Sequence, residues 1–134
     1  MSHYEGVKRQ ALAARDDGFC GVASIAAVLF CGYKRAATLA EQCFGRVHRK
    51  GTAMYSLEAW QKFAKVTGRK VEMEWVMRDT RGLTLGNFAK HYPQGRYVVL
   101  VKRHAVGFRN GINHDWTANG AGRRWVRAII KVGN

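Results

Sequence analysis

The chain has little proline, few acidic residues and no long apolar run, and each shortage excludes a class of protein. Its 134 residues contain one proline and no repeat or low-complexity tract, so no linker divides it. The longest apolar stretch, GVASIAAVLFCG, is too short and too rich in small residues to span a bilayer. The N-terminal MSHYEGVKRQ lacks the apolar centre of a secretory signal. We therefore expect one domain over residues 1–134, with 1–15 as an N-terminal extension, no membrane partner, and a place in the cytoplasm or in a larger assembly.

Cysteine is also scarce. Three cysteines, Cys20, Cys31 and Cys43, are too few and too odd in number for a disulfide framework, so reduced thiols are expected. The nearest metal-like cluster would add His48 to Cys31 and Cys43, but this spacing matches no pattern of metal ligands. We therefore expect neither a metal nor a cofactor.

Basic residues, in contrast, are abundant. Lysine and arginine number 23 against nine acids, which gives a formal charge of +14 and a field that attracts polyanions. The cations are spread along the chain, and no base-reading motif is present. This pattern favours a basic surface that contacts nucleic acid non-specifically or fits an acidic partner protein. Trp60, Trp125 and Tyr55 are candidate stacking groups for nucleic acid, although core packing is the favoured interpretation for them.

The apolar periodicity predicts an α+β domain in which helices come first and a mostly antiparallel sheet follows. Glycines and capping residues punctuate the helical part, whereas alternating apolar residues dominate the last third. The expected helices cover 20–31, 35–44, 57–67 and 84–91, and the expected strands cover 70–77, 96–108, 113–116 and 123–132.

A tight turn at Asn110 and Gly111 predicts the geometry of a hairpin, because Asn-Gly is the strongest short signal for a two-residue loop. The resulting register pairs Val106 with Asp115 and makes His104 a diagonal neighbour of Asp115 on the same face. A carboxylate at that position can hold one imidazole nitrogen and leave the other free. The neighbouring His114 is expected to point to the opposite face.

Cys20 stands at the expected start of an apolar helix, in the stretch RDDGFC. Free N–H groups and the helix dipole stabilise a thiolate at such a position. Cys20, His104 and Asp115 would then form a nucleophile, a base and its orienter, with the Cys20 N–H beside a developing oxyanion. Each residue also has a structural interpretation: a small buried thiol, a hydrogen-bonded sheet histidine and a strand-end turn former. Asp16 and Asp17 are expected helix caps.

Three segments resemble the papain-like cysteine peptidases, and most closely their short bacterial and phage-encoded branch related to bacteriocin-processing peptidases. DDGFCGVASIAAVL is similar to the family's opening of the first helix around the nucleophile. HRKGTAMYSLEAWQKFAKVTG resembles its Gly-Thr loop and following helix, and YVVLVKRHAVGFRNGINHDW resembles the strand and hairpin that carry its histidine and aspartate. The resemblance covers roughly residues 16–132. It implies a papain-like fold and a thiol-dependent peptidase or isopeptidase, with Cys20 as nucleophile, His104 as base and Asp115 as orienter.

The sequence departs from this family at the oxyanion hole. Family members carry a glutamine a few residues before the cysteine, whereas the nearest one here is Gln10, which reaches Cys20 only if the intervening segment folds back. Gln10 and the Cys20 N–H are therefore the candidate oxyanion donors. Two hypotheses follow. One is a phage-encoded hydrolase that acts on a peptide or protein in the host cytoplasm; the other is a catalytically quiet, basic virion or host-interaction protein of the same fold, with nucleic acid as one partner.

Overall fold

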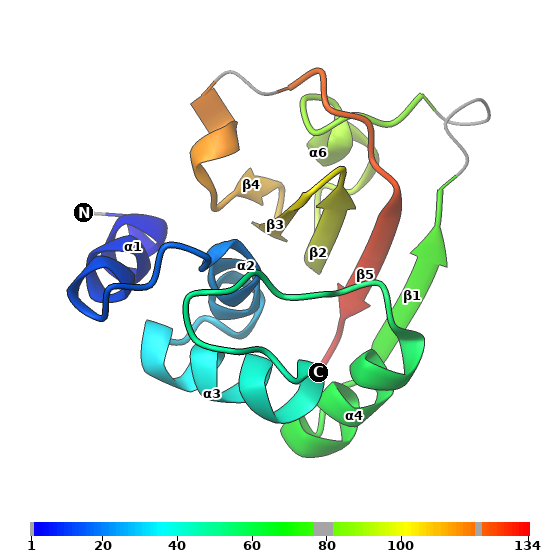
Figure 1. Ribbon diagram of the computed structural model, residues 1–134. Helices are drawn as coiled ribbons and strands as arrows, with labels where there is room; N and C mark the ends of the chain where they lie inside the picture. Colours follow the sequence, from blue (N-terminus) through cyan, green and yellow to red (C-terminus); the bar gives the residue numbers. More distant parts are fainter. Residues whose placement is uncertain (1, 77–81, 120–121) are drawn as a thin grey trace.

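The computed structural model describes residues 2–76, 82–119 and 122–134 as an α+β domain, which confirms the expected class. Its strands form one antiparallel sheet in the order β1-β5-β2-β3-β4 (Figure 1). In chain order, the elements are α1 (His3–Ala13), α2 (Cys20–Leu29), α3 (Tyr33–Phe44), α4 (Leu57–Thr67), β1 (Val71–Trp75), α6 (Phe88–His91), β2 (Arg96–Val101), β3 (His104–Arg109), β4 (Ile112–Asn113), the 3-10 helix η1 (Trp116–Asn119) and β5 (Ala128–Val132).

The sheet has an apolar cluster on each face, because the residues of its central strand β2 alternate between the two. Val98 and Leu100 belong to the cluster shared with helices α1 to α4. Tyr97 and Val99 belong to a second cluster, which the short helix α6 completes with Phe88. The sheet is therefore covered on both faces, and α2 and α3 belong to the larger helical layer (Figure 1).

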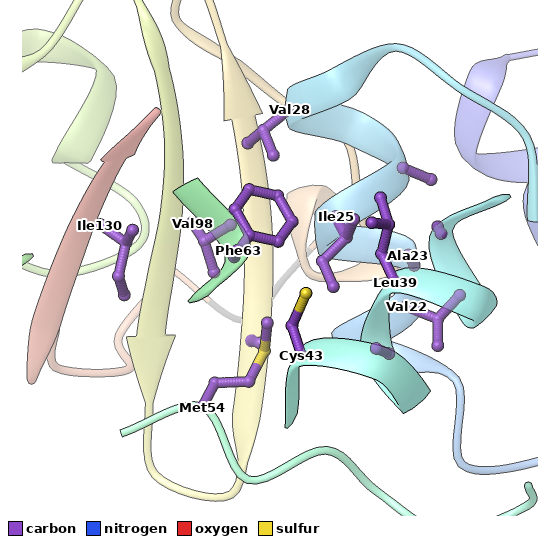
Figure 2. Packing of buried hydrophobic residues seen from close by; sticks show 14 of the residues in the cluster. Val22, Ala23, Ile25, Val28, Leu39, Cys43, Met54, Phe63, Val98 and Ile130 are labelled. Atoms are coloured by element: carbon purple, nitrogen blue, oxygen red, sulfur yellow. The ribbon is translucent and has the colours of Figure 1, made fainter. Parts of the chain in front are cut away.

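Helix α2 is the centre of the helical layer. The side chains of Val22, Ile25 and Val28 are fully buried, and those of Ile25 and Val28 face Phe63 and Val98 (Figure 2). Removing each such aliphatic side chain from water stabilises the fold by roughly 1.5–3 kcal/mol. Such a helix can hold a functional residue at its end in a fixed position.

Helix α2 lies directly on strand β3, and a glycine permits this close approach. A Cβ added to Gly107 would lie 2.4 Å from the Cβ of Ala27 and 3.0 Å from the carbonyl oxygen of Ser24. Real carbon atoms do not approach each other so closely, so any larger residue at position 107 would separate the helix from the strand. The helix and the strand that carry Cys20 and His104 are thus in direct backbone contact.

Several boundaries differ from the sequence-based expectations. The expected extension 1–15 contains helix α1, which buries Val7 and Ala11 in the helical core. Helix α2 ends at Leu29 rather than at residue 31, because Phe30 adopts the left-handed conformation of a C-cap. The Phe30 side chain lies outside the core, with 66% of its surface exposed.

The expected single strand 96–108 is wrong. The structure has two strands, β2 and β3, joined by a turn at Lys102 and Arg103 in which Arg103 has a φ of 59°. Turns that need a positive φ usually contain glycine or asparagine, and neither is present here, so the sequence carried no turn signal.

The remaining strands and the fourth helix are shorter than expected. Within 84–91 only Phe88–His91 is helical, because the Asn87 side chain accepts from the Thr84 N–H and forms a turn instead. The return strand covers Ile112–Asn113 and the last strand Ala128–Val132, whereas residue 77 of the expected strand 70–77 lies outside the described residues.

Candidate active site

Cys20 is the first residue of helix α2, as expected, but the aspartates before it do not cap the helix. The N-cap is Phe19, which makes no side-chain cap hydrogen bond. Asp17 is exposed and lies 3.6 Å from Arg49, while Asp16 is 1% exposed and points into the protein. The expected capping role of the two aspartates is therefore wrong.

Asp16 instead anchors the loop that leads to Cys20. One oxygen of its carboxylate accepts hydrogen bonds from Arg46 at 2.5 Å and from the Gly18 N–H at 3.2 Å, and the other accepts from the Tyr33 hydroxyl at 2.6 Å. Arg46 also donates to the carbonyl oxygen of Gly18. Burial would raise the pKa of Asp16, but the hydrogen bonds and charge of its partners lower it. This buried ion pair fixes the chain immediately before Cys20.

His104 and Asp115 meet as the hairpin geometry predicted. The described ladder pairs Phe108 with Asn113 and Arg109 with Ile112, which is the expected register. The ladder ends at Asn113, so the expected Val106–Asp115 pair is not part of it. The side chains nevertheless approach, with 2.8 Å between His104 Nε2 and Asp115 Oδ2.

Asp115 is held in place by a second residue. Its Oδ2 also accepts hydrogen bonds from the N–H of Thr117 at 3.1 Å and from the Thr117 hydroxyl at 2.8 Å. The side chains of His104 and Asp115 are 8% and 2% exposed. A buried carboxylate with three donors keeps the imidazole in one orientation, in which Nε2 faces Asp115 and Nδ1 is free for another partner.

That other partner is Cys20. Burial would raise the pKa of the Cys20 thiol, but the hydrogen bond and charge of His104, with the N–H groups of Ala105 and Gly21, lower it. Burial would lower the pKa of His104, but Asp115 and Cys20 raise it to about 9. Both shifts favour the charged pair, a thiolate beside an imidazolium, over the neutral pair.

The other two thiols lack such an environment. Burial raises the pKa of both Cys31 and Cys43, and the cations nearby only partly oppose this effect. His114 also differs from His104, because burial and the charge of Arg109 lower its pKa. Among the three cysteines, Cys20 alone has a lowered thiol pKa.

Two pockets flank the Cys20–His104 pair. The first, of about 310 Å³, is mostly apolar and lies between His104 and the loop 51–55. The second, of about 350 Å³, has Phe19 and Trp116 among its lining residues. The Trp116 ring lies 5.4 Å from the His104 ring, because the chain turns into η1 after β4.

Gln10 does not belong to this site, which corrects the expected oxyanion hole. Its Oε1 accepts a hydrogen bond from the Tyr33 N–H at 3.1 Å, and it lines a separate pocket with Cys31. That pocket lies at the C-terminal end of α2, about 15 Å from Cys20 at 1.5 Å per helical residue. Gln10 points away from Cys20 because helix α1 presents another face to the site.

Helix α1 contributes two residues that the sequence reasoning missed. Tyr4 and Lys8, one helical turn apart, line the pocket that contains Cys20, His104 and Asp115. Burial, followed by the negative charge of Asp115, raises the pKa of Tyr4 to about 12. Val7 and Ala11, spaced four residues apart and both buried, are the sequence signal that would have predicted this helix.

The candidate stacking residues separate into buried and exposed. Trp60 is fully buried and donates its indole N–H to the Met54 carbonyl oxygen, which confirms core packing for this residue. Trp125 and Tyr55 are 36% and 40% exposed. Trp75 is 61% exposed and stacks on the Tyr55 ring at 5.4 Å.

Comparison with known proteins adds no relative: no family model, no curated protein and no solved structure matches the chain. Within the described ranges, no three His, Cys, Asp or Glu side chains form a group that could hold a metal ion. Over the same ranges no single helix has the length and apolar composition to cross a membrane, although α2 and α3 pass that test together as a bent pair.

Proposed function

We propose that this protein is a papain-like cysteine hydrolase that cleaves peptide or isopeptide bonds. The observation that carries the proposal is the contact of three groups from distant parts of the chain: the Cys20 thiol, the His104 imidazole and the Asp115 carboxylate. Nucleophile, base and orienter are the three parts that acyl transfer requires. The family resemblance supports the same roles, and it also underlies our proposal of a phage-encoded protein that acts in the host cytoplasm or in a virion.

The catalytic cycle starts from the Cys20 thiolate. Its sulfur attacks the acyl carbon, the leaving amine takes the proton from His104 Nδ1, and a thioester remains on the enzyme. Water then attacks the thioester and gives a proton to His104, so that the acid is released and Cys20 is regenerated as the thiolate. Asp115 holds His104 Nε2 throughout and stabilises the imidazolium.

The oxyanion of each tetrahedral intermediate needs donors, and Gln10 is too distant to be one. The Cys20 N–H at the start of α2 is the first donor in our proposal. The second is the Tyr4 hydroxyl, which belongs to the same pocket as Cys20. Because the pKa of Tyr4 is about 12, its hydroxyl keeps the proton that it must donate.

The apolar pocket beside the pair is our proposed binding site for the acyl part of the substrate. Thr52 lies on its wall, and the Thr52 Oγ1 is buried without a hydrogen-bond partner among the described residues. A buried hydroxyl without a partner is costly, and the amide of a bound peptide would supply one. Gly21 leaves room for this side chain, because a Cβ at position 21 would lie 2.7 Å from the Cβ of Thr52.

The test is hydrolysis of a mixture of fluorogenic peptides by the wild type, Cys20→Ala and the matched control Cys31→Ala. We expect turnover in the wild type and the control and none in Cys20→Ala, with unchanged circular dichroism in all three. Turnover that survives in Cys20→Ala would refute the nucleophile. An unreactive Cys20 in the wild type would favour the second hypothesis, a quiet protein of this fold, for which the charge of +14 and its attraction for polyanions is the supporting observation.

A further inference from the structure

A second, larger cavity lies next to the active site and is strongly basic. Its volume is about 740 Å³, and its wall contains four cationic side chains around Trp125. No acidic side chain among the described residues lines it. The four cations are Lys102, Arg103, Arg124 and Arg127. Such a cavity attracts anionic groups and excludes cationic ones.

This basic cavity borders the active site through two of its arginines. Arg103 lines both the basic cavity and the apolar pocket that contains Cys20. The Arg124 guanidinium lies 5.4 Å from the ring of Trp116, and that ring packs on His104. Lys102 and Arg103 directly precede His104 in the chain. A ligand in the basic cavity therefore contacts residues that are next to His104 in the chain.

Arg103 occupies a position that favours glycine. It is the second residue of the turn between β2 and β3, and its φ of 59° is left-handed. Side chains with a Cβ disfavour this conformation, and strained residues of this kind concentrate at functional sites. Arg103 lines both cavities and therefore lies at the boundary between them.

We propose that the basic cavity binds acidic side chains of the peptide substrate, close to the bond that Cys20 attacks. Arginine guanidinium groups bind carboxylates through two parallel hydrogen bonds, and three of the four cations are arginines. A single ligand that fills both cavities needs an acyl group for the thiolate and anionic groups for the cations. An acidic peptide carries both, whereas a nucleic acid has no acyl group. The inference rests on the proposed hydrolase function for the role of the ligand as a substrate.

The first experiment measures binding separately from turnover. Its probe is a fluorescein-labelled peptide of four glutamates followed by four alanines, and its readout is fluorescence anisotropy with the Cys20→Ala protein. We expect Lys102→Glu with Arg124→Glu to weaken binding at least tenfold. The matched control, Lys34→Glu with Lys65→Glu, makes the same change of net charge at exposed positions on α3 and α4 and is expected to weaken binding less than twofold.

Two comparisons keep this result decisive. Lys102→Gln with Arg124→Gln removes the charges without reversing them, so a loss of binding in this milder variant confirms a local contact if the protein remains folded. Equal losses in the cavity variant and in the matched control would overturn the proposal, because the attraction would then be a property of the whole surface. Tighter binding of a twelve-base oligothymidylate, with the same loss in the cavity variant, would overturn it in favour of nucleic acid.

The second experiment tests whether the cavity serves the active site. Saturating acidic peptide should slow alkylation of wild-type Cys20 by iodoacetamide at least fivefold and leave Cys31 unaffected, and a peptide with glutamine in place of glutamate should protect neither. Binding without protection of Cys20 would overturn the role as a substrate site. Protection without any peptide turnover would refute the proposed hydrolase activity and leave the acidic-peptide site established, so the two failures are distinguishable.

Discussion

The two ends of helix α2 have similar residues and opposite chemistry. Each end has a cysteine, a histidine and a pocket: Cys20 with His104 at the start, and Cys31 with His3 just beyond the end. At the start, His104 hydrogen-bonds the thiol and lowers its pKa. Beyond the end, His3 Nε2 lies 2.7 Å from the carbonyl oxygen of Cys31, and burial leaves the pKa of that thiol raised.

Burial favours a raised thiol pKa at both ends, so the difference in the direction of the pKa shift comes from the histidine that contacts Cys20. What distinguishes Cys20 is an imidazole whose far nitrogen is already held by Asp115, so that the near nitrogen faces the sulfur. The helix adds to this effect, since the positive end of its dipole lies at Cys20 and the negative end near Cys31.

The largest effect is expected when His104 is removed. His104→Ala should lower peptide turnover by about 10³-fold or more, because the thiol loses both its base and its counter-charge. Alkylation of Cys20 at pH 6 should slow by about 100-fold, since a thiol with a pKa near 8.5 is almost entirely protonated at that pH. Mass spectrometry of alkylated peptides gives the rates. The Cys31 rate should not change, and a parallel drop at both thiols would contradict the comparison.

The next effect concerns stability and the buried ion pair before Cys20. Asp16→Ala should reduce the free energy of unfolding by about 3 kcal/mol, because it leaves the Arg46 charge buried without its partner. The matched control is Gln10→Ala, which removes the other hydrogen bond to Tyr33 and should cost about 1 kcal/mol. Urea denaturation measures both values, and equal losses would show that the ion pair has no special role.

The same ion pair gives a pH dependence of stability. The folded pKa of Asp16 is lowered from 3.8, so its stabilisation is present above that value and is lost as the pH falls through the lowered pKa. In Asp16→Ala this acid-induced part of the loss should be absent from the urea curves. If Asp16→Ala lost the same stability at low pH as the wild type, Asp16 would not be the group responsible.

The smallest effect concerns the upper pH limit of peptide turnover. The pKa of His104 is raised from 6.5 to about 9, so the imidazolium contribution is complete below 6.5 and is lost as the pH rises through about 9. Asp115→Asn keeps a hydrogen-bond acceptor but removes the charge. The upper pH limit of peptide turnover should therefore move toward neutral pH, and turnover at pH 7 should fall a few-fold. Peptide turnover against pH measures the shift, because the leaving amine takes its proton from the His104 imidazolium. A limit that stays near pH 9 would show that Asp115 only orients the ring.

Local patterns predicted more of this molecule than long-range ones. The Asn110–Gly111 turn gave the correct hairpin register and brought His104 to Asp115, because a two-residue loop leaves one pairing of the strands. The α+β class and the positions of the main helices also followed from local periodicity. Cys20 was placed correctly at a helix start for the same reason.

The errors arose where tertiary contacts replaced local preferences. Asp16 has the sequence context of a cap, yet a partner thirty residues away, Arg46, binds it in the interior. The turn at Arg103 contains neither glycine nor asparagine, so the sequence predicted one strand where the structure has two. Gln10 was assigned by analogy, whereas the orientation of helix α1 sends Gln10 to Tyr33 and Tyr4 to the site.

The close contact between Gly107 and Ala27 links the two elements that carry Cys20 and His104. Ala27 lies seven residues along the helix from Cys20, and Gly107 lies three residues along the strand from His104. The distances from the contact to Cys20 and to His104 are therefore both about 10 Å, at 1.5 Å per helical residue and about 3.3 Å per strand residue. The helix carries the sulfur and the strand carries the imidazole. The contact between them leaves no free volume, which fixes the separation of the two side chains. A shift of the helix along the strand would change the position of Cys20 relative to His104, so this contact constrains the two side chains together.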